Sequence, residues 1–246
     1  MRNQDFSQLR IILNETSHPG NIGATARAMK IMDIKNLTLV KPKQFPDTVA
    51  YARSSGATDI LDNANICQDL DIALKEQQLI FATSARSRQI SLPTHTPKEA
   101  ANIINSALAS GIKVAILFGN EQHGLSNTDL LKCQHQIIIP TSEEYSSLNL
   151  AAAVQIICYE VFTAQESKPL ESSSTDFANA EQVEQLFIHM ISTLSALEYL
   201  EDKRSSKIAL KIKAMLQQYQ FTSQQVQILR GVLTQINKKI GNHDYT

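Results

Sequence analysis

Short apolar runs alternate with amphipathic segments through the first two thirds of the chain. Five runs are rich in leucine or β-branched residues and have the length of strands, at residues 9–14, 37–41, 79–83, 114–119 and 136–140. Four stretches between them have helical spacing, at residues 21–32, 69–76, 97–109 and 147–162. Because the strands are apolar almost throughout, this alternation predicts an α/β fold whose parallel sheet is covered by helices on both faces.

The pattern changes after residue 164. Residues 164–180 are rich in serine and other polar residues and carry Pro169, which indicates a linker. Three amphipathic helices are predicted after it, at residues 183–197, 203–219 and 223–240. We therefore expect a domain over residues 1–164, a linker over 165–180 and a small C-terminal helical domain over 181–246.

Composition narrows the class of protein. The 246 residues are 43% hydrophobic and 19% charged, which is ordinary for a globular protein, and the apolar runs are too short to span a membrane. The first residues lack the apolar segment of a signal peptide. Cys67, Cys133 and Cys158 show no CxxC spacing, which argues for a reducing compartment and against structural zinc. We expect a cytoplasmic protein that binds no metal.

The net charge of −1 conceals an asymmetry. Residues 203–243 hold eight lysines and arginines and no acidic residue, so 15 basic residues face 24 acidic ones elsewhere. Lys203, Lys207 and Lys211 follow one another at intervals of four on one face of a predicted helix. Such a piece is typical of a polyanion-binding appendage, although a solvated helical face would have the same charge pattern.

Four segments have residues suited to chemistry, and the first is HPGNIGATARAM at residues 18–29. Gly20 and Gly23 would allow a ligand to approach the backbone closely, and the free N–H groups of the helix would favour a phosphate. Arg27 would reach a second anionic group. The spacing matches neither GxGxxG nor GxxxxGK[ST], and a capped helix with a surface arginine remains an alternative.

The other three segments each follow a predicted strand. In TSARSR, residues 83–88, Arg86 and Arg88 suit the binding of a phosphodiester; an exposed loop that carries two charges and binds no ligand is the alternative. In residues 116–126, Gly119 would let a flat ring approach the backbone, and Glu121 would either orient a ligand or cap a neighbouring helix. In residues 137–155, Ser146 or Ser147 is the expected N-cap of the last helix of the domain.

The order and spacing of these segments resemble the SpoU (TrmH-like) branch of the SPOUT superfamily of RNA methyltransferases. Its three motifs correspond here to N21-x-G-x-x-x-R27, to FGNE with GL at 118–125, and to IP followed by SLN at 139–149. The resemblance covers roughly residues 8–162. Similarity to the TrmJ group of tRNA (cytidine/uridine-2′-O-)-methyltransferases is found in three sequence segments, ETSHPGNIGATARAM, TSARSR and SEEYSSLNLA. The C-terminal helical extension also fits that group.

The resemblance implies more than the spacing does. The fold would be a SPOUT α/β knot, in which the C-terminal part of the sheet forms a trefoil knot, and S-adenosylmethionine would bind bent within it. The enzyme would be a homodimer with its site completed across the interface, and tRNA would be methylated at position 32 of the anticodon loop. Residues carried over to the donor pocket are Thr83, Ser84, Ala85, Gly119, Ile139, Ser146, Ser147 and Leu148.

The same resemblance makes Arg27 central to catalysis, with Ser146, Arg86 and Arg88 as further catalytic candidates. Because guanidinium stays protonated in proteins, we expect Arg27 to hold a phosphate and stabilise the developing alkoxide. Candidates for contact with RNA are Asn21, Arg27, Glu121, Tyr145, Lys203, Lys207 and Lys211.

Three alternatives remain open at this point. The acceptor would be ribosomal RNA in one of them, and in another the chain would bind RNA without catalysis. A nucleotide-dependent oxidoreductase is favoured by the α/β pattern alone and lacks the glycine fingerprint. The C-terminal helices would contact either RNA or the partner subunit.

Overall fold

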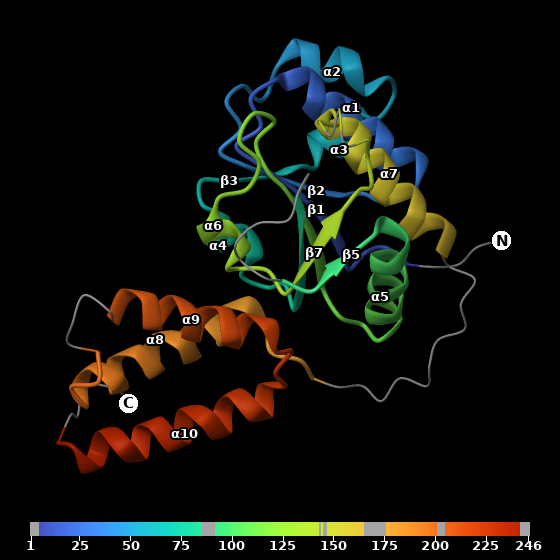
Figure 1. The fold of residues 1–246 in the computed structure, drawn as a ribbon. Helices are drawn as coiled ribbons and strands as arrows, with labels where there is room; N and C mark the ends of the chain where they lie inside the picture. The colour runs from blue at the N-terminus through green and yellow to red at the C-terminus, as the bar shows by residue number, and fades with distance from the viewer. Residues whose placement is uncertain are drawn as a thin grey trace.

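The computed structural model describes residues 5–84, 92–142, 144, 147–164, 176–200 and 205–241. Within these residues, seven parallel strands form one sheet in the order β3-β2-β1-β6-β4-β7-β5 (Figure 1). The strands are β1 (Leu9–Asn14), β2 (Asn36–Val40), β3 (Asn65–Cys67), β4 (Leu79–Ser84), β5 (Thr94–His95), β6 (Val114–Phe118) and β7 (His135–Ile138). The predicted parallel α/β fold is confirmed.

Helices cover both faces of the sheet. They are α1 (Pro19–Ile31), α2 (Thr48–Ser54), α3 (Thr58–Asp62), α4 (Leu70–Leu74), α5 (Pro97–Ala109), α6 (Asn127–Leu130) and α7 (Leu150–Thr163). Ile11 and Leu13 of β1 pack in one core with α1, α5 and α7, whereas Ile12 packs in a second core with α4 and α6. Successive strand residues point to opposite faces, so an entirely apolar strand supplies both cores.

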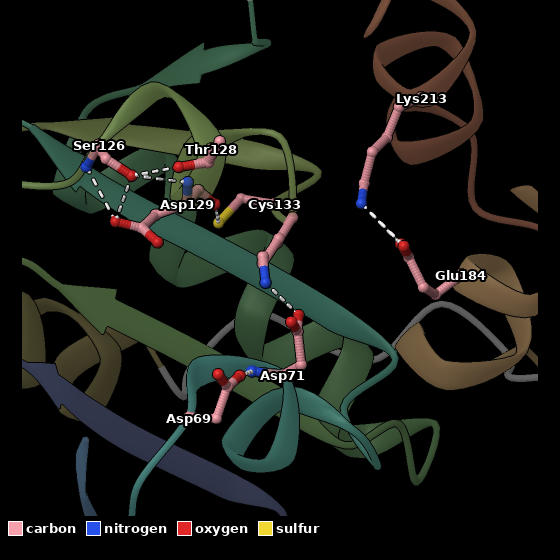
Figure 2. A network of polar contacts seen from close by, with 9 residues as sticks. Asp69, Asp71, Ser126, Thr128, Asp129, Cys133, Glu184 and Lys213 are labelled. Carbon is pink, nitrogen blue, oxygen red and sulfur yellow. Dashed lines mark hydrogen bonds and ion pairs between the residues drawn. The ribbon is translucent and has the colours of Figure 1, made fainter. Parts of the chain in front are cut away.

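Side-chain caps define the short helices of the second face. Asp69 accepts a hydrogen bond from the N–H of Asp71 (2.7 Å) and so starts α4 (Figure 2). Ser126 and Asp129 form a capping box at α6, where the Ser126 hydroxyl accepts from the Asp129 N–H at 3.1 Å (Figure 2). An acceptor side chain at this place satisfies N–H groups that have no partner within the helix.

The last helix of the domain begins later than predicted. Asn149 is its N-cap, because its side-chain oxygen accepts from the N–H groups of Ala151 (2.9 Å) and Ala152 (3.4 Å). The prediction that Ser146 or Ser147 caps this helix is therefore wrong. The remaining predicted strands and helices are present, and each of their bounds lies within three residues of the predicted one.

The C-terminal region contains the three predicted helices, α8 (Ala180–Ala196), α9 (Ser205–Gln218) and α10 (Ser223–Lys239). They have a core of their own, which includes Val183, Leu186, Leu216, Val226 and Leu233. Asn179 and Thr222 form capping boxes that start α8 and α10. No helix in the described part of the chain is both long enough and apolar enough to cross a membrane.

These three helices lie at the amino ends of the strands (Figure 1). Gln77, just before β4, accepts the N–H of Ala180 at 2.8 Å. Gln134, just before β7, accepts the N–H of Ile80 at 2.8 Å and donates to the Gln217 side chain at 3.2 Å. The described end of the predicted linker, residues 176–180, therefore packs against both parts of the protein. The division into domains and the trefoil knot stay predictions.

Two histidines face each other at the short edge strand β5. His95 Nε2 and His135 Nδ1 are 3.0 Å apart, and the His135 ring stacks on Phe81 with a centroid separation of 5.0 Å. Burial, and to a smaller extent the nearby His95, lowers the pKa of His135 to about 4. The fold therefore holds His135 in its neutral form.

This arrangement predicts acid sensitivity. An unfolded histidine titrates near pH 6.5, so the contribution of His135 to stability is complete above that pH and decreases as the pH falls from about 6.5 towards 4. We expect a loss on the order of 1–3 kcal/mol across that interval, and a smaller loss in His135→Gln. Urea unfolding at several pH values measures both proteins. Equal losses in the two would contradict this assignment.

Candidate active site

A pocket of about 330 Å³ opens at the carboxyl ends of β4, β6 and β7. Four segments line it: the end of β4, the loop over residues 118–125, the residues at and after the end of β7, and the start of α7 with the loop before it. Carboxyl ends of parallel strands meet at one edge of a sheet, where ligands of open α/β folds bind. The pocket has the size class of a small-molecule site.

This pocket brings together residues predicted to hold the methyl donor. All six of them that lie in the described part of the chain line it, namely Thr83, Ser84, Gly119, Ile139, Ser147 and Leu148. Ala85 and Ser146 lie outside the described residues. The proximity of these six follows from the fold, whereas their role toward a donor stays a prediction.

The walls of the pocket differ in polarity. Ile137, Ile139 and Leu148 contribute apolar surface, and Thr83 and Ser147 contribute hydroxyl groups. The Thr83 hydroxyl donates to the backbone oxygen of Leu117 at 3.0 Å, which holds the end of β4 against β6. A ligand that suits this pocket has both a flat or aliphatic part and groups that form hydrogen bonds.

Gly119 lets the loop after β6 fold back on itself. A Cβ atom at this position would lie 2.3 Å from the carbonyl carbon of Gly124 and 2.4 Å from the nitrogen of Leu125. The chain itself therefore occupies the space on the Cβ side of Gly119, while Gly119 also lines the pocket, and the approach of a flat ring to its backbone stays a prediction. Within this loop the Gln122 N–H donates to Asn120 Oδ1 at 2.9 Å.

Glu121 connects this loop to the start of α1. Its carboxylate accepts hydrogen bonds from the N–H and the hydroxyl of Ser17, both at 2.8 Å, from the N–H of His18 at 3.2 Å and from Asn21 Nδ2 at 2.8 Å. Partial burial would raise the pKa of Glu121, but the hydrogen bonds from Asn21 and Ser17 lower it overall. The carboxylate is therefore ionised at neutral pH and holds the segment just before α1, whose N-cap is His18; its role in orienting a ligand stays a prediction.

A third motif joins this contact through Asn21. Asn149 Nδ2 donates to Asn21 Oδ1 at 3.0 Å, while Asn149 also caps α7. The chain Glu121–Asn21–Asn149 therefore links residues from all three motifs. Asn149 was not among the predicted site residues, because the helix was predicted to begin at residue 147, although asparagine is a preferred N-cap residue.

The start of α1 differs from its predicted role. His18 caps the helix, since its Nδ1 accepts the Gly20 N–H at 3.0 Å, and the preceding N–H groups donate to Glu121. A Cβ atom on Gly23 would lie 2.0 Å from the Ala50 carbonyl oxygen, so Gly23 permits the packing of α1 on α2. These contacts give Gly23 a packing role and occupy N–H groups at the helix start, whereas a phosphate there and ligand approach at Gly20 and Gly23 stay predictions.

Arg27 lies on α1 with its side chain exposed. It follows Asn21 by six residues, or about 9 Å along the helix axis. Among the described residues it forms no hydrogen bond or ion pair. Lys207 and Lys211 are exposed on α9, at the other end of the sheet. Predicted residues that lie outside the described part of the chain are Arg86, Arg88, Tyr145, Ser146 and Lys203.

Comparison with known proteins identifies the family. Residues 8–159 match the SpoU rRNA Methylase family, and residues 181–244 match the family described as tRNA methyltransferase TrmJ, C-terminal domain. The chain belongs to the SpoU methylase family. The predicted resemblance, including its narrower TrmJ form, is confirmed, because similarity to curated TrmJ proteins extends over nearly the whole chain.

Two of these relatives represent the group. The chain is 39% identical over 244 residues to the tRNA (cytidine/uridine/adenosine-2'-O-)-methyltransferase TrmJ of Pseudomonas aeruginosa (strain UCBPP-PA14), covering 95% of each protein. It is 39% identical over 239 residues to the tRNA (cytidine/uridine-2'-O-)-methyltransferase TrmJ of Escherichia coli (strain K12), covering 95% of this chain and 97% of the relative.

Solved structures agree with this placement. TrmJ from Z. mobilis ZM4 superimposes with a TM-score of 0.83 at 30% identity, over 93% of this chain and 98% of that one. The SpoU methyltransferase AviRb from Streptomyces viridochromogenes, at 20% identity and a TM-score of 0.52, shares the fold over 64% of this chain.

Two glycines of this SpoU methylase provide a matched test of the loop. We expect Gly119→Ala to destabilise the protein by roughly 1–3 kcal/mol and to weaken ligand binding at the pocket, because its Cβ would meet backbone atoms. Gly231 lies within α10 with no atom within 4 Å of an added Cβ. Gly231→Ala should instead stabilise by about 0.5–1 kcal/mol. Denaturant unfolding measures both, and equal signs would contradict the packing at Gly119.

Proposed function

We propose that this protein transfers the methyl group of S-adenosylmethionine to a ribose 2′-hydroxyl of tRNA. The observation that carries the proposal is the pocket at the carboxyl edge, where the six described residues of the expected donor site converge. Membership of the SpoU family and near full-length similarity to proteins named as tRNA 2′-O-methyltransferases support the reaction.

The acceptor that we favour is the cytidine or uridine at position 32 of the anticodon loop. The relatives that cover the whole chain carry tRNA in their names, and so does the family matched by residues 181–244. Ribosomal RNA is the second candidate, because the family matched by residues 8–159 is named for it. The C-terminal helices, absent from that match, distinguish the two in favour of tRNA.

The residues of the pocket fit the proposed donor. Ile137, Ile139 and Leu148 suit the faces of an adenine ring, and the hydroxyls of Thr83 and Ser147 suit its ribose and amino-acid groups. When bound, S-adenosylmethionine supplies a methyl group that its sulfonium has already activated. The protein then has to orient the acceptor ribose, exclude water and stabilise the negative charge that develops on O2′.

Arg27 is the residue that we assign to this charge. Its guanidinium stays protonated, so it serves as a hydrogen-bond donor and a fixed positive charge rather than as a base. Its exposed position leaves its five N–H donors available to a phosphate next to the target ribose and to the developing alkoxide. The proton of the 2′-hydroxyl would then leave to that phosphate or to water.

We also propose that the enzyme is a homodimer whose site is completed by the second copy. Ile31 on α1 and Tyr159 on α7 are 58% and 52% exposed, and the two helices pack side by side. Ala24 on α1 and Ala152 on α7 have small side chains, which would let a second copy approach these two helices closely. A second copy on this surface would bring its Arg27 toward the pocket. We further propose that the protein is cytoplasmic, that its sheet contains the trefoil knot, and that the chain divides into the two domains described above.

Methyl transfer from labelled S-adenosylmethionine to unmodified tRNA, followed by nuclease mapping, tests the reaction. We expect label on the ribose at position 32. Arg27→Ala should lower kcat by about 10²–10³, because one electrostatic contact to the transition state is lost, and should leave donor binding unchanged. Arg27→Lys retains the charge but loses the fork of donors, and it should recover only part of the activity.

The exposed Lys98 on α5 offers a control, and Lys98→Ala should retain full activity. Activity of Arg27→Lys equal to wild type would contradict the need for the forked donors. Label in ribosomal RNA but not in tRNA would support the second candidate. Absence of donor binding by the folded wild-type protein would reject the methyltransferase proposal, including both candidate acceptors.

A further inference from the structure

The basic residues of the methyltransferase domain divide into two groups by their partners. Among the described residues 5–164, six have a partner: Arg10 with the Ala73 carbonyl, Lys30 with Asp59, Lys35 with Asp33, Lys75 with Glu181, Lys113 with Glu76, and Lys132 with Asp71. Five have no such partner within the described part of the chain, namely Arg27, Lys41, Lys43, Arg53 and Lys98. The same pairing occurs in the C-terminal helices, where Lys213 contacts Glu184 at 2.9 Å (Figure 2).

Four of these five unpaired residues lie on α1 or on segments that adjoin it. Lys41 and Lys43 follow β2 at the carboxyl edge of the sheet, and the Lys43 N–H donates to the Thr16 carbonyl at 3.0 Å. Thr16 immediately precedes Ser17, which contacts Glu121 in the pocket wall. The segment after Lys43 passes the start of α1 and continues into α2.

Arg53 lies on α2 directly beside α1. Its Cβ is 3.0 Å from the place that a Cβ of Gly23 would take, and Arg27 follows Gly23 by about one helical turn. In Figure 1, α1 and α2 lie together at the end of the domain away from the C-terminal helices. The order along this surface is therefore Lys41 and Lys43, then Arg53, then Arg27.

The carboxylates nearby do not neutralise this surface. Asp47 accepts the Val49 N–H at 2.7 Å as the N-cap of α2, and Glu15 is the acidic residue beside Lys41, since its N–H donates to the Val40 carbonyl at 2.8 Å. Glu121 is engaged with Ser17, His18 and Asn21. With Glu121 included, four cations thus face three carboxylates at this edge, in a protein whose net charge is −1. A local positive region on a nearly neutral molecule directs a polyanion to that region.

We propose that Lys41, Lys43 and Arg53 form a track for the sugar–phosphate backbone of the acceptor RNA, leading to Arg27. This inference rests on the proposed function and names where the RNA strand adjoining the target ribose lies. Exposed lysines and arginines without intramolecular partners bind phosphates without first breaking an ion pair. The lysines of α9 lie at the opposite end of the sheet and contact a different part of the RNA.

The test compares a triple variant, Lys41→Gln/Lys43→Gln/Arg53→Gln, with wild type in binding unmodified tRNA over a range of salt concentrations. Each lost phosphate contact reduces the slope of log K against log salt by about 0.7–0.9. We expect a slope smaller by about 2–3 and an affinity at least about tenfold weaker at physiological salt. Donor affinity, measured by calorimetry, and the thermal midpoint should match wild type.

Lys98→Gln is the matched control, since Lys98 is also exposed and unpaired among the described residues but lies on α5; its slope should equal that of wild type. If the triple variant does not fold, the single variant Lys43→Glu serves instead. It reverses one charge and should weaken tRNA binding. Unchanged affinity and slope in a folded triple variant, or in Lys43→Glu, would overturn the track. If wild type binds and methylates a ribosomal RNA fragment instead of tRNA, the proposed acceptor fails, and the slope difference measured on that fragment decides the track separately.

Discussion

The carboxylate of Glu121 holds the candidate site together. It comes from the loop after β6, and it accepts four hydrogen bonds, three from Ser17 and His18 just before α1 and one from Asn21 within it. The partial burial that would raise its pKa is offset by these bonds, so the group remains an anion beside the start of a helix, where negative charge is favourable. Asn21 donates to Glu121 and accepts a hydrogen bond from Asn149. One chain of hydrogen bonds therefore positions the pocket wall, α1 and α7.

The strand order explains why this contact is possible. β1 and β6 are neighbours in the sheet although about 100 residues separate them, so the loops that follow them meet at the same edge. β4 and β7 are the next strands in that direction, and their ends complete the pocket. Gly119 then determines the shape of the loop: with a side chain there, the loop could not fold back to present Glu121. A steric constraint and an electrostatic one therefore act on consecutive parts of the same loop.

Features that depend on local pattern were predictable, and features that depend on distant contacts were not. The bounds of β1 and α5 follow from apolar periodicity and, for α5, from a capping box at Thr96 and Glu99. β5 has two residues and β3 exposes two of its three, so neither shows a pattern; α2 and α3 were not predicted, although the equally short α4 was. The six described pocket residues came from motif resemblance. The packing at Gly23 and Gly119 could not be predicted from spacing, because the atoms that these glycines approach lie on α2 and on the returning loop.

Charge shows the same distinction between sequence and structure. Counting residues assigns the positive charge to residues 203–243, but ion pairs in the fold engage five of the eight lysines described within residues 5–164 and leave a second positive surface around α1. This surface adjoins the pocket edge, whereas α9 lies past the amino ends of strands that are at most six residues, or roughly 20 Å, long. An RNA that places one ribose at the pocket can use the nearer surface to align its backbone. Contact with α9 requires an acceptor that extends beyond the sheet, as a folded RNA does and a short single strand does not.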